Sequence, residues 1–129
     1  MGEPQRAFVL LRHETSDGVH WDLMLEAGAS LTTWQLAEDP TRGTEGRRAD
    51  SGGIRARRLP DHRRAYLEYE GPVSGDRGHV TRVERGTCLL VGDGPQSYVV
   101  KLSGERLTGV FEFKVEAADP GLWHFRRVH

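Results

Sequence analysis

The sequence predicts one all-β domain spanning residues 1–129, built mainly as a compact antiparallel β-barrel with one long loop or short helical turn. Three observations support this fold class. Short apolar runs recur at roughly ten-residue intervals, glycine supplies 16 of the 129 residues, and apolar residues nowhere keep a 3.6-residue period over three turns. Short strands separated by glycine-rich turns are typical of antiparallel barrels, with a β-sandwich as the alternative.

Each strand is expected where an apolar run is bounded by turn residues. Residues 19–25 and 31–36 are expected to form a hairpin, and residues 92–95 (Gly-Asp-Gly-Pro) a turn. Residues 37–53 interrupt this rhythm with Pro40 and several glycines among charged side chains, so the long loop is expected there. The expected strands are residues 7–11, 19–25, 31–36, 66–70, 79–84, 87–91, 97–102, 110–115 and 122–128.

Composition excludes several classes of protein. Eighteen basic and nineteen acidic side chains give a formal charge of −1, which excludes a polybasic nucleic-acid arm and a strongly acidic tail. The single cysteine, Cys88, excludes an internal disulfide and a cysteine-rich zinc site, and its apolar neighbours favour a core position. The sequence has no apolar stretch near ~18 residues and no signal-peptide core, so a cytoplasmic protein without membrane contact is expected.

A first polar cluster lies in the second expected strand. The two-residue period of a strand places His20 and Asp22 on one face, with Trp21, Leu23 and Leu25 on the other. His13, at the end of the first expected strand, could reach the same place from the neighbouring strand. Two imidazoles and one carboxylate form a common ligand set for a divalent metal ion. The alternative is a structural hydrogen bond between the histidine and the aspartate.

A second cluster lies around residues 62–71. If the strand at 66–70 extends back to the histidine, then His62, Arg64 and Tyr66 share one face, while Ala65, Leu67 and Tyr69 face the core. A histidine, an arginine and a phenol on one face can bind and polarise a phosphate. The alternative is a solvated sheet face.

Together the two clusters resemble the 3′-phosphoesterase domain of bacterial DNA ligase D, a family that also exists as small stand-alone proteins. The similarity is ordered along most of the chain, from about Phe8 to Val128. The residues that carry it are 12–14, 20–26 and 31–34 of the first motif, His62, Tyr66 and 69–71 of the second, and then 72–87, 102–109 and Trp123.

The resemblance implies a β-barrel that binds one divalent ion, typically manganese, through His13, His20 and Asp22. It also implies that His62 and Tyr66 contact the scissile phosphate, with His20 among the catalytic and phosphate-binding residues. The implied chemistry is the healing of DNA 3′ ends by removal of a 3′-phosphate or a 3′-terminal ribonucleotide. The expected partner is the 3′ end of DNA or RNA-tipped DNA, with a DNA ligase or polymerase as a candidate protein partner and the chain itself a monomer.

Two departures from the family pattern affect the site. The spacing from His13 to His20 is one residue longer than in the family, so a bulge is expected between them. Met24 stands where the family has a phosphate-binding arginine, which removes a charge-assisted contact worth roughly 1.5–3 kcal/mol. Arg64 is the predicted replacement because strand parity places it between His62 and Tyr66.

Two alternatives to a 3′-end phosphoesterase stay open at this point. The loss of the arginine at Met24 permits a catalytically weakened module that binds phosphate or a nucleic-acid end. The histidine and aspartate set also permits an unrelated small metal-dependent β-barrel enzyme.

Overall fold

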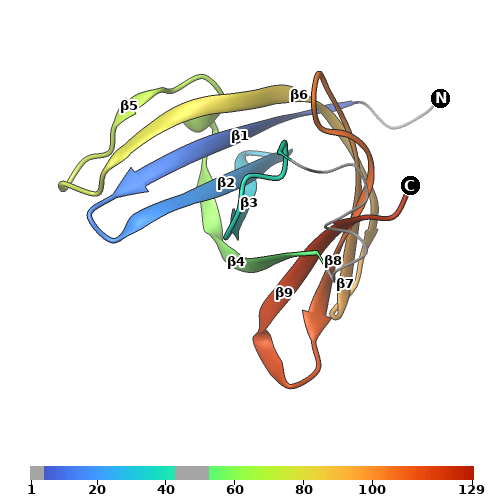
Figure 1. The fold of residues 1–129 in the computed structure, drawn as a ribbon. Helices are drawn as coiled ribbons and strands as arrows, with labels where there is room; N and C mark the ends of the chain where they lie inside the picture. The colour runs from blue at the N-terminus through green and yellow to red at the C-terminus, as the bar shows by residue number, and fades with distance from the viewer. Residues whose placement is uncertain (1–4, 43–52) are drawn as a thin grey trace.

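The computed structural model describes residues 5–42 and 53–129, which form a closed antiparallel β-barrel (Figure 1). Eight strands follow one another around the barrel in the order β1-β2-β3-β4-β9-β8-β7-β6, and pairing of β1 with β6 closes it. A ninth short strand, β5, pairs with β6 outside the barrel. The strands are β1 Arg6–Thr15, β2 Gly18–Ala27, β3 Ser30–Leu36, β4 Ile54–Arg63, β5 Gly71–Pro72, β6 His79–Asp93, β7 Ser97–Gly104, β8 Thr108–Glu116 and β9 Asp119–Arg127.

These observations confirm the expected fold class. The helical structure in the described residues is one 3₁₀ turn, η1 (Arg64–Leu67), so long helices are absent from that part of the chain. No helix there is long and apolar enough to cross a membrane. The expected long loop lies largely at residues 43–52, outside the described residues, and residues 37–42 form bends and turns.

The inner face of the strands forms the main hydrophobic core. Alternate residues of β1 and β2 point inward, including Leu10 and Leu23, and both are fully buried. Trp34 stacks on Phe113 with ring centroids 3.9 Å apart, which joins the two sides of the barrel. Cys88 is buried in this core, as its apolar neighbours predicted.

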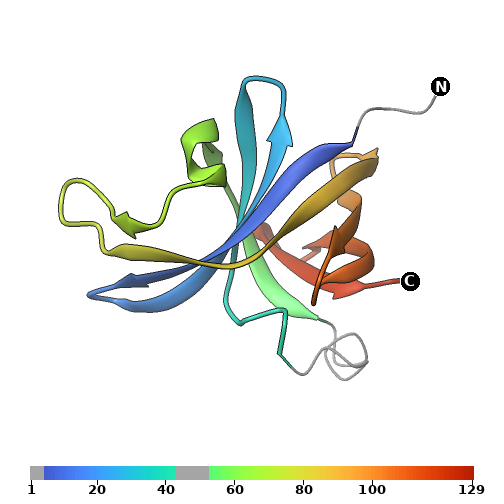
Figure 2. The same ribbon diagram turned by 90° about the horizontal axis from the view of Figure 1, so that it is seen from above.

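The outer face of the same strands carries a second, smaller apolar cluster. Its buried members are Val9, Leu11, Met24, Leu31 and Val80. The excursion formed by η1 and the loop leading through β5 to β6 covers this cluster with Tyr66, Leu67 and Val73. Figure 2 shows this excursion projecting from one side of the barrel, away from β7, β8 and β9. The candidate site lies beneath it.

The prediction of a strand at residues 66–70 is wrong. The chain leaves the sheet at Arg63 and forms η1, in which the partly buried Tyr66 and Leu67 pack against the outer apolar cluster. Tyr69 is 37% exposed and does not face a core.

The strand that does form here is β4, which the apolar pattern missed. Its sequence alternates poorly, and only Ile54 and Ala56 are buried, so its conformation depends on pairing with β3 and β9. A register shift in the β3–β4 pairing accommodates Pro60, which lacks the N–H needed for a regular ladder.

Two smaller expectations also differ from the structure. The strands expected at 79–84 and 87–91 are parts of one long strand, β6. The bulge expected between His13 and His20 is absent, because β1 and β2 pair without a register shift from Phe8 to Thr15. A two-residue turn joins Thr15 to Gly18, so the additional residue lengthens the hairpin.

Candidate metal and phosphate site

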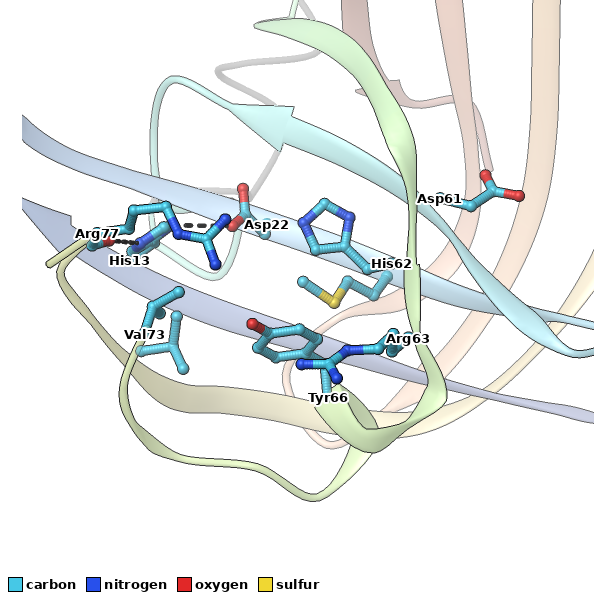
Figure 3. A pocket seen from close by; sticks show the side chains of 10 residues that line it. His13, Asp22, Asp61, His62, Arg63, Tyr66, Val73 and Arg77 are labelled. Carbon is cyan, nitrogen blue, oxygen red and sulfur yellow. Dashed lines mark hydrogen bonds and ion pairs between the residues drawn. The ribbon is translucent and has the colours of Figure 1, made fainter. Parts of the chain in front are cut away.

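A cavity of about 260 Å³ lies between the outer face of β1 and β2 and the excursion that covers it. Figure 3 shows His13, Asp22 and Arg77 grouped on one side of this cavity, with His62, Arg63 and Tyr66 on the other. The cavity therefore brings together side chains from segments far apart in the sequence. Its lining residues are His13, Asp22, Met24, Asp61, His62, Arg63, Tyr66, Val73, Arg77 and Val80.

The β1–β2 hairpin brings three metal-ligating side chains together. His13 lies directly opposite His20, and Asp22 follows two residues later on the same face. One ligand atom from each residue lies within 4.8 Å of the others. Asp22 is buried and the two imidazole rings are partly buried, with ring centroids 4.7 Å apart. The expected clustering of these residues is confirmed, although His20 does not line the cavity itself.

A backbone hydrogen bond orients the His13 ring. His13 Nε2 lies 2.7 Å from the Arg77 carbonyl oxygen. Because a carbonyl oxygen only accepts, Nε2 carries the proton and the neutral ring keeps its lone pair on Nδ1. Nδ1 lies 3.3 Å from Asp22 Oδ2. Metal-binding histidines commonly donate their second ring N–H to a carbonyl in this way.

The surroundings of the Asp22 carboxylate fit a divalent cation. Its Oδ1 is buried without a hydrogen-bond partner in the described residues, although His20 Nε2 lies 3.3 Å away. Its Oδ2 faces the lone pair of His13, and two acceptors this close repel each other unless a cation or proton lies between them. Two imidazoles and a carboxylate suit a divalent ion that keeps open coordination positions.

His62 and Tyr66 line the opposite side of the cavity. His62 Nδ1 donates to the Pro60 carbonyl at 2.9 Å, so the neutral ring keeps Nε2 as its lone-pair nitrogen. The Tyr66 ring meets the His62 ring edge to face, with centroids 5.7 Å apart. Packing of Tyr66 on the outer apolar cluster holds its ring beneath β4. The two residues of the second motif are therefore brought to the same cavity as the first.

Arg64 is held away from this cavity. Its guanidinium forms an ion pair with Glu26 and donates to the Gly28 carbonyl at 2.9 Å. The Ala7 N–H and the Arg64 guanidinium lower the pKa of Glu26. The premise that Arg64 shares a strand face with His62 and Tyr66 is wrong, because β4 ends before Arg64. Its predicted role in phosphate binding is not tested by the structure.

Two arginines that sequence reasoning missed do line the cavity, Arg63 and Arg77. The Arg77 guanidinium donates through Nε to the Ser74 carbonyl at 2.7 Å and through Nη2 to the Ser74 hydroxyl at 3.1 Å. Gly78 has φ +94°, and a Cβ there would lie 2.0 Å from the Glu14 carbonyl oxygen, so the loop packs directly on β1. Strand parity gave no signal for Arg77 because it lies in a turn.

A comparison with protein-family models identifies the family of the domain that contains this cavity. Residues 11–114 match the model of the DNA ligase D 3′-phosphoesterase domain. The chain belongs to this family. The match covers every residue that lines the cavity and confirms the resemblance found in the sequence. A comparison with curated proteins gave no match.

Membership of the DNA ligase D 3′-phosphoesterase family supports a phosphoesterase role in DNA end processing, with DNA 3′ ends as the partner. The cavity between the β1–β2 hairpin and the excursion is therefore the candidate active site of this 3′-phosphoesterase domain. A possible metal-binding triad, His13, His20 and Asp22, lies at its edge. The family match also argues against an unrelated metal-dependent barrel enzyme.

Proposed function

We propose that this chain is a manganese-dependent phosphoesterase that removes a 3′-phosphate or a 3′-terminal ribonucleotide from DNA and leaves a 3′-hydroxyl. The observation that carries the proposal is the arrangement of two motifs around one cavity. The proposed metal ligands His13 and Asp22 face His62 and Tyr66 across a cavity of about 260 Å³. A phosphate in that space would contact both groups.

In the proposed phosphatase reaction, the oxygen of water forms a bond to phosphorus and the bond to the 3′ oxygen breaks. The 3′ oxygen takes a proton and leaves as a hydroxyl group, and inorganic phosphate is released. The attacking water gives up one proton, and His62 is suited to accept it through Nε2, which carries the lone pair because Nδ1 donates to the Pro60 carbonyl. The 3′ oxygen takes its proton from solvent water. The Tyr66 hydroxyl is a candidate donor to a phosphoryl oxygen.

The metal ion would be held by His13, His20 and Asp22. When bound, a divalent cation supplies Lewis-acid stabilisation of negative charge on the phosphoryl oxygens. The chain's own contribution is to keep the three ligands oriented, through the His13 bond to the Arg77 carbonyl and through the pairing of β1 with β2.

Arg77 is our proposed substitute for the arginine that Met24 replaces. Met24 is 1% exposed and lines the cavity, but its thioether donates no hydrogen bond. Arg77 lines the same cavity, and Ser74 orients its guanidinium while leaving Nη1 without a partner in the described residues. An oriented guanidinium offers a phosphate a charge-assisted hydrogen bond. Its attachment to Ser74 supports Arg77 over Arg64, which Glu26 already neutralises.

The test is an end-processing assay on a primer-template whose primer ends in a 3′-phosphate, with a second primer ending in a single ribonucleotide. We expect product with a 3′-hydroxyl from both primers in manganese and none in EDTA. The Asp22→Ala variant, purified in the same way, excludes a contaminating nuclease. An inactive wild-type protein on both primers, across manganese, magnesium, zinc and cobalt, would contradict the proposal.

Met24 favours a second candidate function, a module that binds a phosphorylated DNA end without turnover. Loss of a phosphate-binding arginine weakens catalysis more readily than it removes the cavity. This candidate predicts that the wild-type protein binds a 3′-phosphate oligonucleotide more tightly than its 3′-hydroxyl counterpart and yet releases no phosphate. Restoring the arginine with Met24→Arg would then be expected to create activity.

A further inference from the structure

A second cavity, of about 200 Å³, adjoins the candidate active site. Arg63, Tyr66 and Val73 line both cavities, so the two spaces meet across the Tyr66 side chain. Figure 3 shows the Tyr66 ring between Val73, on the loop after η1, and Arg63, at the end of β4. The remaining lining residues of the second cavity are Ala65, Tyr69, Pro72 and Ser74. None of the described residues that line it is acidic.

Tyr69 presents an aromatic ring whose position is fixed before any ligand binds. Its hydroxyl donates to the Pro72 carbonyl, and the ring lies perpendicular to Tyr66 with centroids 5.8 Å apart. The side chain is nevertheless 37% exposed. A Cβ at Gly71, where φ is +134°, would lie 3.1 Å from the Tyr69 hydroxyl oxygen, so glycine leaves room for this arrangement. The Tyr69 hydroxyl is therefore occupied by a hydrogen bond within the fold, while the partly exposed ring can contact a ligand.

Arg63 supplies positive charge at the boundary between the two cavities. It lines both of them, is exposed, and forms no ion pair or side-chain hydrogen bond with the described residues. By contrast, Arg64 next to it is neutralised by Glu26. The second cavity therefore combines a held aromatic ring with an unpaired guanidinium, which is the combination that binds single-stranded nucleic acid.

We propose that the second cavity binds the nucleoside that carries the scissile phosphate on its 3′ oxygen, with the nucleobase stacked against Tyr69. The inference rests on the proposed function, since it takes the first cavity as the phosphate site. A nucleoside is covalently joined to that phosphate, so its base must occupy space adjoining the first cavity, and the second cavity provides such a space. Arg63 then faces the sugar–phosphate backbone of the same strand.

This subsite recognises the presence of a base and not its identity. Stacking uses the π face that every base has, and the Tyr69 hydroxyl is already committed to Pro72. We therefore expect similar binding of 3′ ends that terminate in adenine, guanine, cytosine or thymine. We expect weaker binding of an end whose terminal nucleotide lacks its base.

The test measures equilibrium binding by fluorescence anisotropy in EDTA, so that no turnover is needed. The probes are 3′-phosphorylated single-stranded oligonucleotides with thymine or an abasic residue at the terminal position, and a matched oligonucleotide with the abasic residue six nucleotides upstream. For the wild-type protein we expect the terminal abasic residue to weaken binding about tenfold. The upstream abasic residue is expected to have no effect.

Two variants assign the effect to the ring. Tyr69→Leu keeps apolar bulk but removes the aromatic face, and we expect it to abolish the difference between the thymine and abasic ends. Tyr69→Phe keeps the face and loses only the hydroxyl, so the difference is expected to persist. Val91→Ala, an exposed position that lines none of the cavities described here, is the control and is expected to bind as the wild type does. The wild-type comparison of the two ends does not depend on any variant folding correctly.

Failure of the subsite and failure of the proposed function give different results. Equal binding of thymine and abasic ends, or a difference that survives Tyr69→Leu, overturns the subsite. A strong preference for one base also overturns the subsite.

Phosphate release in manganese at the same rate from the thymine end and the abasic end also overturns the subsite, but it leaves the phosphoesterase proposal intact. Base-dependent binding by a protein that never releases phosphate overturns the phosphoesterase and supports the subsite. Failure to bind any of the oligonucleotides overturns the subsite as well.

Discussion

The regions around Asp22 and Glu84 each hold a buried carboxylate, and the two carboxylates have opposite surroundings. Glu84 of β6 lies opposite Leu10 of β1 and accepts hydrogen bonds from three backbone N–H groups, those of Arg85, Arg106 and Leu107. Asp22 of β2 lies on the outer face, and its Oδ1 has no hydrogen-bond partner in the described residues. Their side chains are similarly buried, so the difference lies in the available donors.

This difference distinguishes a structural carboxylate, Glu84, from the carboxylate that we propose as a metal ligand, Asp22. Burial alone would raise the pKa of Glu84, but the backbone N–H groups of Arg106, Leu107 and Arg85 outweigh it and the pKa is lowered. Glu84 thereby fixes the turn between β7 and β8 in the ionised form. Among the described residues, no backbone N–H donates to Asp22 Oδ1, and two imidazoles lie beside the carboxylate instead. A buried acid that lacks protein donors is the one available to a cation.

The largest expected effect is on catalysis, from Asp22→Asn. This nearly isosteric change removes a proposed metal ligand, and we expect kcat/KM for 3′-phosphate removal to fall at least about a hundredfold, more than the effect typical of residues that merely support metal ligands. The metal-free variant is expected to unfold at a temperature close to that of the wild type. Activity assays and thermal denaturation measure the two quantities.

Manganese itself provides a control for that prediction. Excess manganese should raise the Tm of the wild type, because a ligand that binds only the folded state stabilises it, and should leave the Tm of Asp22→Asn unchanged. An equal rise in both proteins would contradict the assignment of Asp22 as a ligand.

A somewhat smaller catalytic effect is expected from Arg77→Ala. Loss of a charge-assisted phosphate contact corresponds to roughly 10–100-fold in kcat/KM. The matched control is Arg64→Ala, which removes an arginine paired with Glu26 and is expected to change kcat/KM less than about twofold. The opposite ranking, with Arg64→Ala the more damaging of the two, would restore the prediction made from strand parity. Both variants are assayed at saturating manganese.

The Glu84→Gln variant tests the structural role of Glu84 in fixing the turn between β7 and β8. The amide keeps one acceptor, which can face the N–H donors of Arg106 and Leu107 at the Oε2 position, but its NH₂ group then lies against the Arg85 N–H. We expect the free energy of unfolding to fall by about 1–3 kcal/mol, with kcat/KM of the remaining folded protein unchanged. Chemical denaturation at pH 7 measures the loss. A catalytic defect at unchanged stability would contradict the structural role.

The smallest expected effect is the pH dependence of the free energy of unfolding that Glu84→Gln loses relative to the wild type. Because the pKa of Glu84 is lowered in the folded protein, ionised Glu84 contributes stability above its ordinary value of 4.5. This contribution is lost as the pH falls below about 4.5 and through the lowered pKa. The stability difference between wild type and Glu84→Gln should therefore be constant from pH 6 to 8 and shrink below pH 4.5. Denaturation curves at several pH values measure it, and a difference that grew in acid would contradict the sign of the shift.

The clustering of His13, His20 and Asp22 on the β1–β2 hairpin was predictable because it depends on local sequence. The alternation of β2 separates Asp22 from Leu23 in both the sequence and the structure, and Leu23 lies in the main core. A short turn fixes the register of neighbouring strands, so placing His13 beside His20 needed nothing from the rest of the chain. The resemblance to a phosphoesterase family likewise depended on motifs read in order.

The side of the cavity lined by Arg63 and Tyr66 was less predictable, because it depends on packing between segments far apart in the sequence. Residues 64–67 alternate like a strand, but they form a 3₁₀ turn in which Tyr66 and Leu67 both pack against the outer apolar cluster. In that turn Arg64 forms an ion pair with Glu26, and in the following loop Arg77 lines the cavity. The contacts that place both arginines join residues far apart in the chain.

The sequence by itself therefore determined the barrel, the two faces of β1 and β2, and the clustering of His13, His20 and Asp22, because these follow from period-two alternation and a short hairpin. Only the tertiary structure decided which arginines line the cavity and that a second cavity opens beside Tyr66. Those features depend on how the excursion between β4 and β6 packs against the outer face of the barrel. Packing of that kind is set by the burial of side chains from separate segments, which a local pattern does not encode.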